Sequence, residues 1–294
     1  MNRRPIGVFD SGIGGLTVVR ELMHQLPHES LIYFGDTARV PYGNKSPETV
    51  RRFSREILDF LLGRDVKLVV VACNTASSHA LEELQRVSPV AVEGVIEPGA
   101  RAAVAATKSG RIGVIGTTGT IASGAYERAI RAAALASGRD RAGGASDASG
   151  RAREPSGAAD GMAEVTALAC PLFVPLVEEG WLDRPASRLI AEEYLRPLAQ
   201  HRIDTLVLGC THYPLLKPLI AEVLGPGITL VDSAEQTAAA VSRELAASTL
   251  HAPATQTGHV HFVVSDAPKQ FVTVGQRFLG ARVKDVEVKV MGEG

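Results

Sequence analysis

The chain has 294 residues, with 31 Lys and Arg residues against 32 Asp and Glu residues, and a formal net charge of −1. This length predicts about two domains with real hydrophobic cores, and the even charge balance gives no electrostatic reason to expect nucleic acid or an anionic membrane as a partner. No apolar run is long enough to cross a bilayer and the start does not have the pattern of a signal peptide, while three cysteines argue against a disulfide framework and predict reduced thiols in the cytoplasm.

Short β-branched segments alternate with longer amphipathic segments along the chain. The expected strands lie at 6–10, 31–35, 68–73, 90–92, 111–116, 165–169, 205–210, 229–231 and 259–264. The expected helices lie at 16–26, 47–62, 77–87, 120–135, 185–200 and 234–247. This alternation predicts βαβ units, mainly parallel sheets and an α/β fold. Functional residues should then follow the carboxyl ends of the strands.

Residues 137–163 interrupt this pattern. They are mostly Gly, Ala, Ser, Asp and Arg, and Met162 is their only large apolar side chain. Such a segment buries too little apolar surface to offset the entropy of ordering it. We therefore predict a mobile surface insertion here.

Two short sequence patterns occur twice, once in each half of the chain. The segment at 6–12 (IGVFDSG) resembles that at 112–118 (IGVIGTT), and 69–75 (VVVACNT) resembles 206–212 (LVLGCTH). The two spacings differ by about the length of the insertion. The chain is therefore predicted to form two pseudo-symmetric α/β lobes, the second lengthened by the insertion.

Cys73 and Cys210 occupy equivalent places in these repeats. Each closes an apolar strand and precedes a polar turn into a helix, whose N-terminus favours a thiolate. A single cysteine in an apolar run is usually a small core residue, and Cys170 fits that description, but two at matched strand ends favour a function. Inverting a stereocentre needs a base on one face and an acid on the other. A Cys210–His212 nucleophile is the alternative, and it leaves Cys73 unexplained.

The loops after the other strands carry weaker signals. The turn at 10–15 (DSGIGG) is glycine-rich, as in phosphate sites, but it lacks the G-x-G-x-x-G register and the P-loop lysine, and Asp10 would repel a phosphate. Its carboxylate better suits an ammonium group or an acid–base partner. The loops at 35–43 and 116–120 are rich in donors suited to a carboxylate, although ordinary turns look the same. No Cys or His cluster has zinc-ligand spacing, so we expect no metal.

Five motifs resemble those of the bacterial glutamate racemase family, in family order and over nearly the whole chain. They are 8–15 (VFDSGIGG), 35–43 (GDTARVPYG), 72–77 (ACNTAS), 169–178 (ACPLFVPLVE) and 209–214 (GCTHYP). Only 137–163 departs markedly, since family members usually have a shorter connection there. The resemblance implies a cofactor-independent racemase that makes D-glutamate for peptidoglycan, with glutamate as substrate and a homodimeric assembly.

The resemblance also implies roles for individual residues. Cys73 and Cys210 would be the two bases, Asp10 and His212 their proton-handling partners, and Glu178 a further acidic residue. The implied substrate-binding residues are Asp10, Ser11, Tyr42, Gly43, Asn74, Thr75, Thr211 and His212, with Thr117 and Thr120 assisting.

The resemblance further implies that the second lobe is inserted in the first, with the active site in the cleft between them. Lobe one would comprise residues 1–97 and 211–294, and lobe two residues 98–210. Three other functions stay open from the sequence: an aspartate racemase, a phosphotransferase that uses the turn at 10–15, and a non-catalytic regulatory binder.

Overall fold

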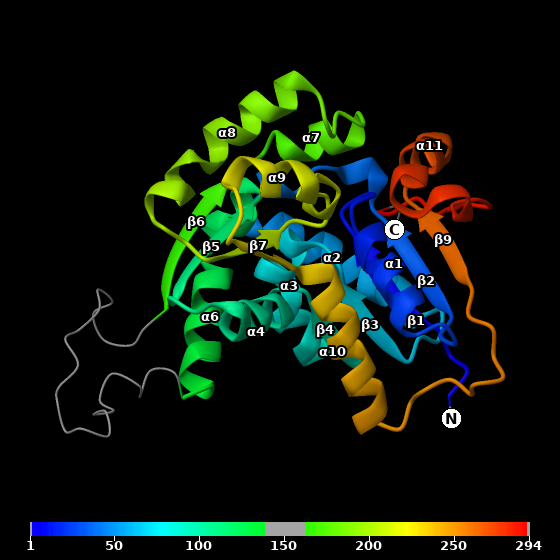
Figure 1. The fold of residues 1–294 in the computed structure, drawn as a ribbon. Helices are drawn as coiled ribbons and strands as arrows, with labels where there is room; N and C mark the ends of the chain where they lie inside the picture. The colour runs from blue at the N-terminus through cyan, green and yellow to red at the C-terminus, as the bar shows by residue number, and fades with distance from the viewer. Residues whose placement is uncertain (1, 139–162, 293–294) are drawn as a thin grey trace.

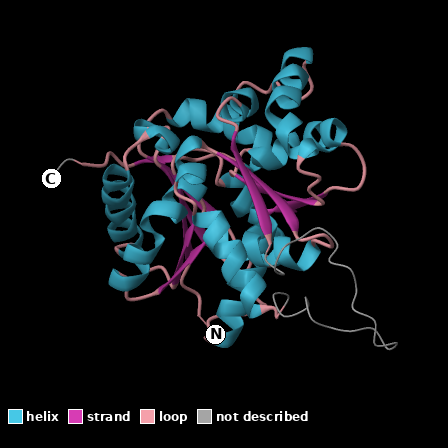
Figure 2. Cartoon of the chain, turned by 90° about the vertical axis from the view of Figure 1, so that its left-hand side faces the viewer, coloured by secondary structure: helices cyan, strands magenta, loops and turns pink. Residues whose placement is uncertain are grey.

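A computed structural model describes residues 2–138 and 163–292. Their strands form two sheets, with the orders β10-β9-β2-β1-β3-β4 and β6-β5-β7-β8 (Figures 1 and 2). The strands are β1 (Ile6–Asp10), β2 (Leu31–Gly35), β3 (Leu68–Val71), β4 (Ala91–Gly94), β5 (Arg111–Gly116), β6 (Glu164–Ala169), β7 (Thr205–Gly209), β8 (Thr229–Asp232), β9 (Val260–Val264) and β10 (Glu287–Val288). Every paired strand is parallel to its neighbour. The predicted α/β fold with parallel sheets is confirmed.

Helices cover the faces of both sheets (Figure 2). They are α1 (Leu16–Gln25), α2 (Pro47–Leu62), α3 (Asn74–Val87), α4 (Ile96–Ala106), α5 (Thr118–Ala122), α6 (Ala125–Ala136), α7 (Phe173–Glu178), α8 (Pro185–Gln200), α9 (Lys217–Leu224), α10 (Ser233–Ala247) and α11 (Pro268–Leu279). Because the helices bury both faces of the sheets, strands such as β1 and β3 are buried along their whole length.

The two sheets repeat one topology. The order β2-β1-β3-β4 in the larger sheet is matched by β6-β5-β7-β8 in the smaller one. The segments at 6–12 and 112–118 fall on the equivalent strands β1 and β5, and Cys73 and Cys210 follow the equivalent strands β3 and β7. The short sequence repeats therefore correspond to a structural repeat.

The two sheets share one hydrophobic core. A single cluster of buried side chains runs from β1 and β3 through α4 and α10 to β5 and β7. Helix α10 contacts both α1 and α4 (Figure 1). Strand β8 belongs to the smaller sheet, so an end of lobe two at residue 210 would cut that sheet. We retain the two-lobe division as a proposal, with the second boundary moved beyond β8.

Several elements differ from the sequence prediction. The helix expected at 120–135 is two helices, α5 and α6, because Gly124 between them has φ of +64°. Helix α3 begins at Asn74 rather than at residue 77. The sequence analysis missed α4, α7, α9, α11 and β10. In α4 the Pro98-Gly99 pair hides the helix, since both residues are poor helix formers.

The predicted surface insertion at 137–163 lies outside the described residues, except for residues 137, 138 and 163. Among residues 2–138 and 163–292, no helix is both long and apolar enough to cross a membrane.

Candidate active site

The carboxyl ends of equivalent strands from the two sheets meet around one cavity of about 360 Å³. Cys73 follows β3 and Cys210 follows β7, and both thiols line this cavity. Both residues are buried, with 6% and 5% of their surface exposed. Within each sheet, the parallel topology places all the carboxyl ends at one edge, and these two edges line the cavity.

Cys73 sits at the N-terminus of α3. Its sulfur accepts a hydrogen bond from the Ala76 N–H at 3.4 Å, and its thiol donates to the Ser11 hydroxyl at 3.6 Å. Burial raises the pKa of Cys73 to about 12, and the nearby Asp10 carboxylate adds to this, while the hydrogen bonds with Ala76 and Ser11 oppose it. The Cys73 sulfur therefore holds its proton at neutral pH.

Cys210 has a different electrostatic environment. Its sulfur lies 3.8 Å from Nδ1 of His212, whose Nε2 lies 2.9 Å from the Glu178 carboxylate at the end of α7. Burial alone would lower the pKa of His212, but the hydrogen bonds to Cys210 and Glu178 outweigh it and raise this pKa to about 10. At neutral pH the ring is therefore an imidazolium, held between the Cys210 sulfur and the Glu178 carboxylate.

Asp10 lies behind the cavity wall at the end of β1. Its Oδ2 accepts the Gly12 N–H at 2.9 Å, and its buried Oδ1 has no hydrogen-bond partner among the described residues. Burial raises the pKa of this carboxyl, and the charge on His212 partly opposes the rise. Asp10 is thus electrostatically coupled to both His212 and Cys73.

Three threonine hydroxyls join the two lobes beside the cavity. Thr75 from α3 lies 2.9 Å from Thr117 and 3.2 Å from Thr120, which are 3.0 Å from each other. Thr75 and Thr117 line the cavity, whereas Thr120 is buried behind them. The triangle holds the start of α3 against the start of α5.

The glycine-rich turn after β1 packs tightly against the Cys210 loop. A Cβ on Gly14 would lie 2.3 Å from the Thr211 hydroxyl and 2.5 Å from the His212 ring. The Thr17 hydroxyl donates to the Thr211 carbonyl oxygen at 2.9 Å. This close approach accounts for the glycine without a phosphate ligand.

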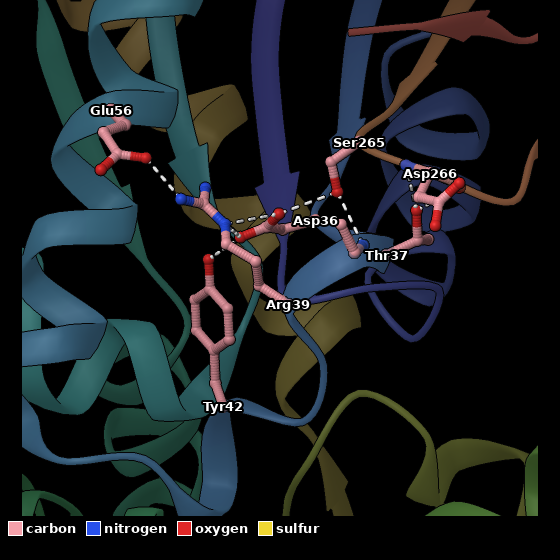
Figure 3. A network of polar contacts seen from close by, with 8 residues as sticks. Asp36, Thr37, Arg39, Tyr42, Glu56, Ser265 and Asp266 are labelled. Carbon is pink, nitrogen blue, oxygen red and sulfur yellow. Dashed lines mark hydrogen bonds and ion pairs between the residues drawn. The ribbon is translucent and has the colours of Figure 1, made fainter. Parts of the chain in front are cut away.

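Tyr42, which lines the cavity, is held by a buried polar network (Figure 3). Its hydroxyl donates to the Asp36 carboxylate, which also accepts from Arg39 Nε at 2.7 and 3.0 Å and from the Ser265 hydroxyl at 2.9 Å. Arg39 in turn pairs with Glu56 on α2. The network ties the loop after β2 to α2 and to the end of β9.

The structure brings together most of the side chains selected from the sequence. Those lining the cavity are Ser11, Tyr42, Gly43, Cys73, Asn74, Thr75, Thr117, Glu178, Cys210, Thr211 and His212. Asp10 and Thr120 lie behind the wall. The sequence analysis missed the apolar wall residues Val40, Pro41, Pro171 and Val174, together with Asp36, Arg39 and Ser265. Six of these residues lie inside the quoted motifs at 35–43 and 169–178, whereas Ser265 lies in no motif.

Comparison with known proteins identifies the family. A family profile described as Asp/Glu/Hydantoin racemase matches residues 6–241. The chain belongs to the Asp/Glu/hydantoin racemase family. It is 53% identical over 283 residues to the glutamate racemase of Geobacter metallireducens, covering 96% of this chain and 95% of that one. It is 50% identical over the same length and coverage to the glutamate racemase of Syntrophus aciditrophicus.

Solved structures of racemases from this family share the fold. The glutamate racemase of Thermus thermophilus, solved with β-chloro-D-alanine, is 45% identical with a TM-score of 0.81, over 98% of this chain and 97% of that one. The Francisella tularensis glutamate racemase, solved with D-glutamate, is 35% identical with a TM-score of 0.83, over 98% of each chain. An aspartate racemase of Picrophilus torridus shares only 14% identity at a TM-score of 0.56 and supports the fold alone.

For this racemase-family member, the geometry permits one kind of chemistry especially well. Two thiols face one small cavity, one protonated and one beside an imidazolium. Such a pair can remove a proton from a bound carbon acid and return a proton. Among the described residues that line the cavity there is no Lys or Arg, so anionic groups there would be bound by neutral donors and His212.

Proposed function

We propose that the protein interconverts L- and D-glutamate by two-base proton transfer, with Cys73 and Cys210 on opposite faces of the substrate α-carbon. One observation carries this proposal: thiols from equivalent strands of the two repeated sheets line the same cavity. The glutamate racemases that resemble the chain at 45–53% identity support the choice of substrate.

The reaction needs one thiolate and one thiol at a time. The thiolate takes the α-proton and leaves a planar carbanion, and the opposite thiol gives its proton to the other face. We assign Cys210 to L-glutamate and Cys73 to D-glutamate. The resemblance of the motifs at 72–77 and 209–214 to those of glutamate racemases supports this assignment.

The cavity wall offers neutral donors that suit the two carboxylates of glutamate. The Ser11, Thr75, Thr117 and Thr211 hydroxyls and the Asn74 amide line it. Asp10 would stabilise the positive charges near it, including that on His212, and Glu178 would keep the imidazolium in place. These groups supply binding and proton transfer, so we propose a reaction without metal or organic cofactor.

Optical rotation of glutamate tests this function directly. Dialysed and chelated protein should bring either L- or D-glutamate to zero rotation, with no comparable effect on aspartate. Activity restored only by a metal or by pyridoxal phosphate would contradict the cofactor-independent reaction. Turnover of aspartate but not glutamate would favour the sibling activity, and Mg²⁺-dependent nucleotide binding would favour a phosphotransferase.

We further propose that the enzyme acts in the cytoplasm as a homodimer. Its product, D-glutamate, is then used to make peptidoglycan. Expression in a bacterium that requires external D-glutamate should restore its growth. Continued dependence on D-glutamate despite expression of active protein would contradict this role. Light scattering of the purified protein measures the oligomeric state.

A further inference from the structure

The Asn74 side chain has an unused donor beside the cavity. Asn74 is the first residue of α3, directly after Cys73, and it lines the cavity although only 2% of its surface is exposed. Its Nδ2 is buried and has no hydrogen-bond partner among the described residues. Leaving a buried amide donor unpaired is costly, so this group needs a partner, which a bound ligand can supply.

The orientation of this amide is set from the other lobe. Tyr126, in the first turn of α6, donates its hydroxyl to the Asn74 Oδ1 at 2.7 Å. Tyr126 is buried, and burial raises the pKa of its hydroxyl, so the hydroxyl stays protonated throughout the working pH range. Because an amide carries its acceptor and its donors on opposite branches, a donor on Oδ1 leaves Nδ2 directed elsewhere.

The Tyr126 ring is itself held in place at the junction of the lobes. A Cβ on Gly209 would lie 2.9 Å from Tyr126 Cε2, and a Cβ on Gly99 would lie 3.5 Å from its hydroxyl. Gly209 is the residue before Cys210, and Asn74 is the residue after Cys73. One side chain therefore contacts the immediate neighbours of both thiols.

We propose that Tyr126 is a positioning residue that fixes the Asn74 amide so that Nδ2 donates to a carboxylate of the bound substrate. The inference rests on the proposed function, which supplies the carboxylate. Without the Tyr126 hydroxyl, the amide can rotate and turn Oδ1 toward the cavity. An acceptor facing a carboxylate repels it, so substrate binding should weaken while proton transfer at the thiols continues.

Tyr126→Phe tests this because it keeps the ring and removes only the hydroxyl. We expect KM to rise about tenfold for both enantiomers, equivalent to about 1.4 kcal/mol, with kcat changed less than about threefold. An effect on KM alone indicates lost binding that is equal in the ground and transition states. Tyr213→Phe is the matched control, since its buried hydroxyl donates to the Cys170 carbonyl oxygen at 2.8 Å, outside the cavity. It should leave KM unchanged.

A double-mutant cycle separates positioning from a general structural effect. Once Asn74→Ala has removed the amide, Tyr126→Phe should raise KM no further. Asn74→Asp keeps an acceptor for the Tyr126 hydroxyl but puts an acceptor in place of the donor, so it should raise KM more than Asn74→Ala. This variant also tests the orientation if Tyr126→Phe does not fold.

Clear results would overturn the inference. These are an unchanged KM in folded Tyr126→Phe, additive effects in the cycle, or a smaller KM increase in Asn74→Asp than in Asn74→Ala. Failure of the proposed function looks different, because the unmodified protein would then fail to racemise glutamate at all.

Discussion

At the scale of single residues, the asymmetry between the two thiols depends on His212. Its two ring nitrogens face the Cys210 sulfur and the Glu178 carboxylate. Among the described residues, the Cys73 sulfur is hydrogen-bonded to Ser11 and Ala76 and to no histidine ring. Because folding raises the pKa of His212 to about 10, the free energy of unfolding should depend on pH.

The sign of that effect follows from linkage. An unfolded histidine has a pKa of about 6.5, so the folded state binds this proton more tightly. The stabilisation should be fully present below pH 6.5 and be lost as the pH rises toward about 10. Denaturant unfolding between pH 6 and 10 should therefore show a larger loss of stability in the unmodified protein than in His212→Asn. Parallel curves would show that the ring gains no proton affinity on folding.

The buried Asp36 carboxylate is predicted to stabilise the fold and to hold Tyr42 in place. It is fully buried and accepts hydrogen bonds from Tyr42, Arg39 and Ser265 (Figure 3). Asp36→Asn removes the charge that these donors surround, so we expect a loss of about 2 kcal/mol in the free energy of unfolding and a raised KM through the displaced Tyr42. Chemical denaturation and steady-state kinetics measure the two effects.

The matched control is Asp59→Asn. This residue pairs with Arg55 on the exposed side of α2, and 55% of its side-chain surface is exposed. Its loss should cost less than about 0.5 kcal/mol and leave KM unchanged. Equal effects of the two substitutions would mean that the buried network does not position the loop.

At the scale of elements, helix α10 ends with an unfavourable residue. The Leu250 N–H donates to the Leu245 carbonyl oxygen at 2.9 Å, which closes a Schellman motif, and Thr249 occupies its left-handed position with φ of 54°. Glycine is preferred there because a β-branched residue is strained. Thr249→Gly should therefore raise the free energy of unfolding by about 1 kcal/mol.

Gly225 provides the opposite test at the end of α9. Its φ is +78°, and a Cβ there would meet no atom within 4 Å among the described residues beyond its chain neighbours. Its ψ is 177°, a combination essentially restricted to glycine. Gly225→Ala should therefore destabilise through the backbone alone, by about 2 kcal/mol. For the Thr249 prediction, an unchanged or lowered midpoint of unfolding in Thr249→Gly would show that the left-handed conformation of residue 249 does not destabilise the fold.

The elements also show what the sequence could predict. Strands β1, β2 and β5 were predicted to the residue, because parallel strands buried on both faces are continuous apolar runs. Helix α11 was missed because it follows Ala267, which takes a left-handed conformation with φ of 51° that no local pattern announces. The Asp36–Ser265 hydrogen bond joins residues 229 positions apart, so no motif could have revealed it.

At the scale of the whole molecule, the repeat of one sheet topology is what creates the site. Equivalent strands β3 and β7 each deliver a cysteine to the same cavity, and the shared core with α4 and α10 holds the two sheets together. The sequence repeat predicted this pairing, but the contacts that join the lobes, such as the one between Thr75 and Thr117, required the structure.

The most direct test of the account measures the two cysteines separately. Serine keeps the size of cysteine but is a far weaker base at neutral pH, since the reactive form is the thiolate. Cys73→Ser and Cys210→Ser should each lose racemisation by orders of magnitude, because both proton transfers are obligatory. In D₂O, Cys73→Ser should still exchange the α-proton of L-glutamate only, and Cys210→Ser that of D-glutamate only, as followed by NMR. Cys170→Ser, a buried cysteine outside the cavity, is the control with full activity. Full racemisation by either variant, or loss of exchange with the same enantiomer in both, would contradict the opposed-thiol mechanism.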